Sequence, residues 1–211
     1  MKIKLVLFDL DGTLIQSTEI IMNSFRETFK KYFNNVDVES AITEFLGQTL
    51  SETFGKYTND NHDINEIIRY YRETSENMIK ENLKEYPNAK NTLNVLRQMN
   101  IRIGVVTSKM KDVAIQHLEK TGLSKYIEFL VGYEDVEKHK PDPEPINKAL
   151  NYFNIRNENV IYIGDHENDI ISAKKANILS CGVTYSYRIK EILDHNPDFV
   201  VDDLKSILDL I

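Results

Sequence analysis

Six short apolar runs, separated by longer stretches with helical spacing, limit what this chain can fold into. The runs are rich in the branched residues typical of strands buried on both faces. Between them, apolar residues recur three or four positions apart, which is the spacing of one helix face. The alternation favours a parallel sheet with right-handed crossovers. The runs are Ile3–Phe8, Ile101–Thr107, Phe129–Tyr133, Val160–Ile163, Ile178–Thr184 and a weaker one at Phe199–Val201.

The expected fold class is therefore α/β, with a Rossmann-like open parallel sheet and helices on both faces. Ligands of such sheets bind beyond the carboxyl ends of the strands. One predicted helix presents Leu93, Leu96 and Met99 on its apolar face. A helix after the second run presents a second apolar face and ends near Gly122, because glycine commonly follows a helix terminus. The residues of that second face are Val113, Ala114, His117 and Leu118.

Residues 16–83 break the alternation. Two apolar stripes with helical spacing begin at Ile20 and Ile64, and no strand pattern lies between them. We therefore expect an all-helical cap domain at 16–83, inserted into an α/β core domain made of 1–15 and 84–211. The stripes are expected to be interior faces of the cap. Both connections fall near the carboxyl end of the sheet, so the inserted domain could act as a lid.

The charge balance narrows the range of partners. The 211 residues carry 26 Lys and Arg against 33 Asp and Glu, a formal net charge of −7. This balance argues against a general binder of nucleic acid or anionic membrane. A single cysteine, Cys181, excludes an intramolecular disulfide and fits a reducing compartment. With no signal-peptide pattern and no apolar run of ~20 residues, we expect a cytoplasmic protein, a monomer by default with a dimer left open.

The strongest chemical signal follows the first strand. Asp9 and Asp11 lie two residues apart, before Gly12 and Thr13. Two carboxylates that project to the same side are unfavourable unless a cation or hydrogen bonds compensate. Gly12 permits the chain to turn sharply away from the strand. An ordinary Asp-Gly turn with solvated acids is the weaker alternative.

Three further signals come at the ends of later strands. Thr107 and Ser108 offer hydroxyls that suit phosphate oxygens, although such residues also cap helices. Prolines after Lys140 hold a lysine in place, with Lys138 as the alternative inward residue. Asp165 and Asp169 are four positions apart and can meet in a first helical turn, where acids can also simply stabilise the helix dipole.

Together these signals indicate one site. Carboxylates from Asp9, Asp11, Asp165 and Asp169 are hard oxygen ligands, which Mg²⁺ prefers together with substrate phosphate. The sequence has no cluster of Cys and His residues that would suggest zinc. We therefore predict a magnesium site that accepts a small phosphorylated substrate.

The four motifs, in this order, resemble those of the haloacid dehalogenase-like hydrolase superfamily. The similarity covers essentially the whole chain and is greatest to members with a helical cap after the first motif, such as phosphoglycolate phosphatases and pyrophosphatases. It implies a Mg²⁺-dependent phosphatase that hydrolyses a small phosphorylated metabolite through an aspartyl-phosphate. Hydrolysis of inorganic pyrophosphate, or a mutase reaction like that of β-phosphoglucomutase, is the alternative.

The resemblance also implies roles for individual residues. Asp9 matches the nucleophile and Asp11 the general acid/base. Thr107 and Ser108 match the phosphate-binding motif, and Lys140 matches the lysine that neutralises charge between nucleophile and phosphate. The metal would be held by Asp9, the Asp11 carbonyl and Asp165, with Asp169 in support of its water shell.

The residues that would recognise the substrate are marked less specifically in the sequence than the four motifs. The cap stretch with Gln48 and Thr49 resembles a specificity loop, but it lacks the cation that phosphoglycolate would favour. Arg188 could supply that missing charge, and His166 is interpreted as non-catalytic. Asp11 disfavours the dehalogenase branch and the phosphonate-cleaving branch of the superfamily. The phosphonate-cleaving branch also needs a Schiff-base lysine in the cap, for which Lys56 is only a weak candidate. The inserted domain also argues against the alternative that the chain is a signalling receiver domain. The presence of every motif residue argues against a catalytically inactive, protein-binding relative.

Overall fold

The computed structural model describes residues 3–33, 36–40, 42–46, 48–58 and 63–211. Over these residues the chain divides into two compact units. One comprises residues 1–15 and 84–211, and the other residues 16–83. No helix in the described ranges is long and apolar enough to cross a membrane.

The larger unit is built on a six-stranded parallel sheet, which confirms the expected fold class. The strand order is β3-β2-β1-β4-β5-β6, so β1 lies at the centre between β2 and β4. All five strand pairs are parallel. The strands are β1 (Leu5–Phe8), β2 (Arg102–Val106), β3 (Phe129–Val131), β4 (Val160–Gly164), β5 (Leu179–Val183) and β6 (Phe199–Val201).

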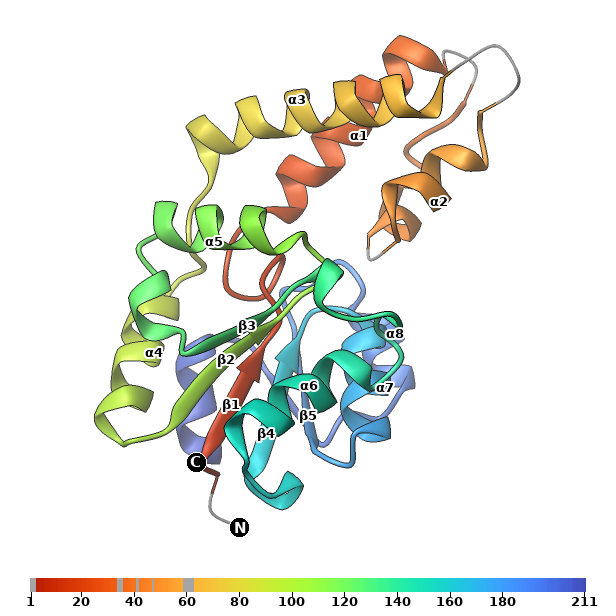
Figure 1. Cartoon of the computed structure of the whole chain (residues 1–211). Helices are drawn as coiled ribbons and strands as arrows, with labels where there is room; N and C mark the ends of the chain where they lie inside the picture. The colour runs from red at the N-terminus through yellow and green to blue at the C-terminus, as the bar shows by residue number, and fades with distance from the viewer. Residues whose placement is uncertain (1–2, 34–35, 41, 47, 59–62) are drawn as a thin grey trace. The chain divides into compact units, whose positions relative to one another are not determined.

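Helices cover both faces of this sheet (Figure 1). The order of strands reverses direction after β3, so right-handed crossovers place α4 and α5 on one face and α6 and α7 on the other. Leu5 and Leu7 of β1 share a buried cluster with α6 and α7. The helices are α4 (Ala89–Gln98), α5 (Lys111–Lys120), α6 (Glu144–Phe153), α7 (Glu167–Lys175) and α8 (Ile189–Asp194), with short 3₁₀ helices at Ser124–Tyr126, Tyr133–Asp135, Asn157–Asn159 and Leu204–Leu210.

Some helix details differ from the expectations. Met99 is 47% exposed because α4 ends at Gln98, one residue before it. Val113 is exposed on α5, whereas Ala114, His117 and Leu118 are buried as expected. Gly122 adopts a φ of +69° just after α5 and so occupies the left-handed position that follows many helices. The last helix of the chain, Leu204–Leu210, is of the 3₁₀ type, and the sequence pattern does not predict α8.

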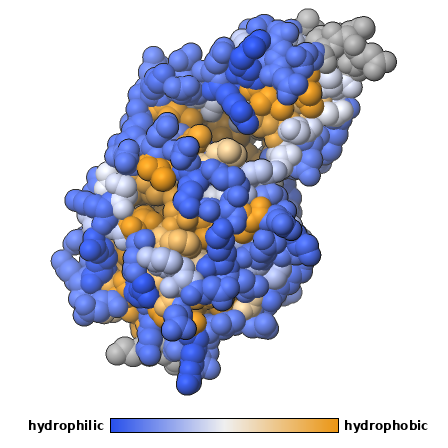
Figure 2. Space-filling model, in the orientation of Figure 1, coloured by the Kyte–Doolittle hydropathy of each residue, from blue (hydrophilic) through white to orange (hydrophobic). Residues whose placement is uncertain are grey.

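All the secondary-structure elements among the described residues of the smaller unit are helices. This unit consists of α1 (Thr18–Tyr32), a 3₁₀ turn at Ile42–Phe45, α2 (Leu50–Gly55) and α3 (Ile64–Asn82). Its interior is a cluster of aromatic rings in which Phe25 packs against Phe45, Phe54 and Tyr71. This core contains most of the first apolar stripe and the first part of the second, whereas Met78 and Ile79 near the end of α3 lie outside it and are only partly buried. Polar side chains cover much of the molecular surface visible in Figure 2.

The two ends of this insertion are joined within the larger unit. Ile15 and Glu85 form an antiparallel bridge, and the Tyr86 N–H donates to the Leu14 carbonyl at 2.9 Å. Residues 14–15 follow directly on the loop after β1. The chain therefore leaves and re-enters the larger unit side by side, close to the carboxyl end of the central strand.

The aromatic cluster yields a test of the division into units. Replacing Phe25 by Ala removes a ring that is 2% exposed and should destabilise the smaller unit by about 3–5 kcal/mol. Hydrogen–deuterium exchange should therefore accelerate in α1 and α3, while the amides of β1 and β4 keep their protection. Met99→Ala, at an exposed position, is the matched control. Equal loss of protection in both units would contradict their independence.

Candidate active site

The acidic loop after β1 depends on a glycine. Asp9 is buried at the end of β1, where its N–H donates to the Ile163 carbonyl of β4 at 2.9 Å. The chain turns at Gly12, which has a φ of +75°. A Cβ atom at Gly12 would lie 2.0 Å from Oδ2 of Asp165. Glycine therefore allows this loop to approach the acidic loop that follows β4.

The second acidic loop also depends on a close approach. A Cβ atom on Gly164, the last residue of β4, would lie 2.2 Å from Oδ2 of Asp169. Asp169 is buried in the first turn of α7, where its carboxylate accepts the His166 N–H at 3.0 Å. The Thr13 hydroxyl donates to Oδ1 of Asp165 at 3.2 Å. This hydrogen bond ties the two acidic loops together.

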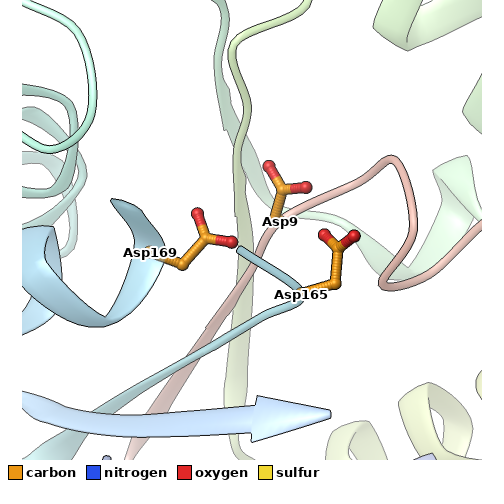
Figure 3. A group of neighbouring side chains, drawn as sticks. All are labelled: Asp9, Asp165 and Asp169. Atoms are coloured by element: carbon orange, nitrogen blue, oxygen red, sulfur yellow. The ribbon is translucent and has the colours of Figure 1, made fainter. Parts of the chain in front are cut away.

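Three carboxylates meet where these loops converge (Figure 3). One oxygen from each of Asp9, Asp165 and Asp169 lies within 4.8 Å of the others. Burial raises the pKa of Asp9 to about 7, with Lys140 opposing the shift and Asp169 adding to it. Burial and the charges of Asp9 and Asp169 raise the pKa of Asp165 well above its ordinary value. A hard divalent cation would relieve this repulsion, so the donor set fits Mg²⁺.

Lys140 inserts an ammonium group among these acids. Its Nζ atom donates to Oδ1 of Asp9 at 2.8 Å and to Oδ1 of Asp169 at 2.6 Å. The side chain is 6% exposed, whereas the alternative lysine, Lys138, is exposed at the surface. Burial alone would lower the pKa of Lys140, but Asp169 and Asp9 outweigh it and raise the pKa well above the usual range. Lys140 therefore stays charged.

Thr107 lies beside the centre of the site, at the end of β2. It is buried, its N–H donates to the Val131 carbonyl at 3.0 Å, and its hydroxyl accepts the Lys109 N–H at 3.2 Å. Ser108 is exposed next to it. Nζ of Lys109 lies 3.1 Å from Oδ2 of Asp11, which connects the β2 loop to the β1 loop.

The sequence matches a known family over most of its length. A profile of the family described as haloacid dehalogenase-like hydrolase matches residues 6–183, which include both acidic loops and Lys140. The chain belongs to the haloacid dehalogenase-like hydrolase family. The resemblance inferred from the four motifs is thereby confirmed.

Individual relatives cover nearly the whole chain. A Clostridium perfringens protein with the provisional name pyrophosphatase PpaX is 38% identical over 99% of this chain and 97% of its own length. The pyrophosphatase PpaX of Oceanobacillus iheyensis is 34% identical over 100% of this chain and 98% of its own. A solved Clostridium difficile structure, provisionally described as a phosphatase, has a TM-score of 0.82 and 31% identity, covering 100% and 99% of the two chains.

Several supporting side chains of this hydrolase escaped the sequence analysis. The hydroxyl of Tyr162 on β4 accepts a hydrogen bond from Lys140 Nζ at 2.9 Å and donates to the Val106 carbonyl at 2.7 Å. On the loop after β5, the hydroxyl of Tyr185 donates to the Thr13 carbonyl at 2.9 Å, and that of Ser186 donates to the Asp165 carbonyl. Tyr185 and Ser186 carry one signal in the sequence, since they are polar residues close to the end of a strand, whereas Tyr162 lies in the middle of β4 and carries none.

The residues predicted to recognise the substrate make contacts with neighbouring side chains of the protein. Thr49 caps α2 in a reciprocal pair with Glu52, and Oε1 of Gln48 accepts a hydrogen bond from Lys56 at 3.0 Å. Arg188 forms two hydrogen bonds with Glu167, at 2.7 and 2.6 Å. These contacts fix the side chains but assign no substrate to them.

His166 lies at the start of α7, next to the acidic loop. Its Nδ1 accepts the Asn168 N–H at 3.1 Å and lies 3.1 Å from a carboxylate oxygen of Glu167. Burial lowers the pKa of His166 below its ordinary value. The ring therefore acts as a helix cap, in keeping with a non-catalytic interpretation.

The crowded carboxylates yield a pH-dependent test of metal binding. Because the pKa of Asp9 is about 7 in the folded chain against an ordinary 3.8, the folded metal-free protein holds a proton that the unfolded chain has lost. Its stability should therefore fall as pH rises from about 4 to about 7. Mg²⁺ competes with protons for these oxygens, so its addition should raise the melting temperature more near pH 8 than near pH 6.

Differential scanning fluorimetry with MgCl₂, against EDTA and NaCl of equal ionic strength, measures this difference. Asp165→Asn should lose most of the Mg²⁺ effect. A shift of equal size at both pH values, or one that Asp165→Asn keeps, would contradict a metal site at these carboxylates.

Proposed function

We propose that the chain is a Mg²⁺-dependent phosphatase that works through an aspartyl-phosphate on Asp9. The family and its phosphatase-named relatives support the phosphatase activity. The observation that carries the more specific proposal is the contact of Lys140 with Asp9 and Asp169, which form with Asp165 a group of carboxylates whose oxygens lie within 4.8 Å of one another. Such a cluster suits an anionic nucleophile that must meet an anionic substrate.

The proposed reaction has two displacements at phosphorus. In the first, a carboxylate oxygen of Asp9 attacks, the bond to the leaving oxygen breaks, and Asp11 gives that oxygen its proton and becomes a carboxylate. In the second, Asp11 takes a proton from water, which attacks the same phosphorus. Phosphate departs, and the Asp9 carboxylate is restored.

The cations of the site oppose the repulsion between substrate and nucleophile. Asp9, Asp165 and the carbonyl of Asp11 would hold Mg²⁺, with Asp169 in support. When bound, the ion supplies positive charge next to the transferring phosphoryl group. Lys140 contributes a fixed ammonium group, while Thr107 and Ser108 offer hydroxyl and backbone donors to the phosphoryl oxygens.

We further propose that residues 16–83 act as a mobile cap. Their two connections leave the larger unit as a bridged pair at Ile15 and Glu85, directly after the catalytic loop. Closure of such a domain would exclude water during the first displacement, and its reopening would admit water for the second.

The substrate is a small phosphorylated compound, and inorganic pyrophosphate is the first candidate. Two relatives that match nearly the whole chain carry the name of a pyrophosphatase. Phosphoglycolate is the second candidate, although Arg188 is paired with Glu167 and Gln48 with Lys56. A β-phosphoglucomutase-like reaction would instead return labelled phosphate to a sugar.

The nucleophile is tested by Asp9→Asn. The amide is nearly isosteric but is a much weaker nucleophile, so phosphate release should fall by at least about a thousandfold. The assay measures release from pyrophosphate and from p-nitrophenyl phosphate with Mg²⁺, and circular dichroism checks the fold. The exposed Asp209→Asn is the matched control. Turnover of Asp9→Asn at the wild-type rate would refute the mechanism.

The role of the Tyr162 hydroxyl in positioning Lys140 is tested by Tyr162→Phe. The change removes a hydroxyl that bonds both Lys140 and the Val106 carbonyl, and it leaves the ring in the core. A hydrogen bond to a charged group contributes about 1.5–3 kcal/mol, so kcat should fall roughly tenfold or more while KM changes little. An unchanged kcat would show that the hydroxyl is not needed to position Lys140.

A further inference from the structure

Besides Lys140, the site has a second ammonium group, on the loop after β2. Nζ of Lys109 lies 3.1 Å from Oδ2 of Asp11, and the two side chains are 15% and 21% exposed. We propose that Lys109 binds an anionic leaving group and so gives the enzyme a preference for phosphoanhydrides over phosphate esters with uncharged leaving groups. This inference rests on the proposed function, in which Asp11 contacts the leaving oxygen.

The backbone of Lys109 is held on both sides. Its N–H donates to the Thr107 hydroxyl at 3.2 Å, and its carbonyl accepts the Tyr133 N–H at 2.9 Å. These bonds fix the start of the side chain next to the phosphate-binding motif. The ammonium group therefore lies beside Asp11 on a loop whose backbone is held by hydrogen bonds. Because the loop is already ordered, less conformational entropy is lost when Lys109 binds a ligand.

The two lysines of the site have different surroundings. Lys140 is 6% exposed and donates to two buried carboxylates, so its charge serves the nucleophile and the acidic loop. Lys109 is more exposed and contacts the residue that faces the leaving group. Lys140 thus acts on the transferred phosphoryl group, and Lys109 acts on the leaving group.

Helix α5 packs an uncharged ring near this pair. His117 is buried, and burial, with a further contribution from the charge of Lys109, lowers its pKa to about 4. His117 is therefore neutral near pH 7 and adds no charge of its own. Asp11 remains the counter-ion of Lys109. An anionic group attached to the leaving oxygen of the substrate would share the ammonium group with Asp11.

The geometry of the leaving group brings it within reach of Lys109. A leaving oxygen that accepts a proton from Asp11 lies at about 2.7 Å from that carboxylate. In pyrophosphate this oxygen carries a second phosphoryl group, and its charged oxygens are the ones that Lys109 would bind under this proposal. An ester with an uncharged aryl group offers nothing that an ammonium group would bind as strongly.

The test compares two substrates whose leaving groups have similar basicity but different charge: pyrophosphate and p-nitrophenyl phosphate. Lys109→Met keeps the length of the side chain and removes its charge. We expect kcat/KM for pyrophosphate to fall roughly 10- to 100-fold, the effect of one charge-assisted hydrogen bond. The value for p-nitrophenyl phosphate should change by less than about threefold. Lys109→Arg should restore the preference, and the exposed Lys190→Met is the matched control.

The outcomes separate this inference from the proposed function. Equal losses on both substrates would mean that Lys109 only positions Asp11, and would overturn the inference while the phosphatase mechanism stands. An unchanged preference in Lys109→Met would overturn it as well. If the wild-type enzyme released phosphate from neither substrate in the presence of Mg²⁺, the proposed function itself would fail.

Discussion

Lys140 places an ammonium group in the interior of the larger unit, and the arrangement of the site depends on how that charge is balanced. Burying an isolated charge is very costly, so it requires partners at hydrogen-bond distance. Asp9 and Asp169 supply them at 2.8 and 2.6 Å, and Tyr162 adds its hydroxyl at 2.9 Å. These partners come from the end of β1, the first turn of α7 and the middle of β4. The charge is therefore balanced only when the sheet and its loops are assembled.

The same assembly forces negative charges together. Gly12 and Gly164 each leave room for a neighbouring carboxylate where a Cβ atom would collide with it. Asp9 and Asp165 have raised pKa values, which means that the folded chain tolerates the full ionisation of these two acids poorly. A divalent cation would offset this repulsion. Crowded acids beside a fixed ammonium group suit the metal ion and the phosphoryl group that we propose for this site.

Much of this arrangement could be predicted from the sequence. The carboxyl ends of parallel strands meet at one edge, so motifs after the first, second and fourth strands had to converge. This argument brought together Asp9, Thr107 and Asp165 without any knowledge of the structure. The order of the motifs indicated the family. The apolar stripes of residues 16–83 likewise predicted a helical interior, because their spacing is that of buried helix faces.

The parts that could not be predicted depend on side-chain geometry across distant segments. The strand pattern marks Tyr162 as buried, but not as the residue whose hydroxyl bonds Lys140. No spacing rule pairs Lys109 with Asp11, since they lie on different loops. Arg188 could be placed near the site, yet its pairing with Glu167 depends on the approach of the β5 loop to α7. Roles for such residues follow from distances rather than from motifs.

The central claim is that Asp9 carries the phosphoryl group between the two displacements. Rapid acid quenching during turnover with Mg²⁺, followed by peptide mass spectrometry, tests it most directly. The account predicts a peptide that contains Asp9 and has gained one phosphoryl group, with fragmentation placing the group on that side chain. A phosphoryl group on another residue, or an unmodified Asp9 peptide throughout a pre-steady-state burst of product, would contradict it.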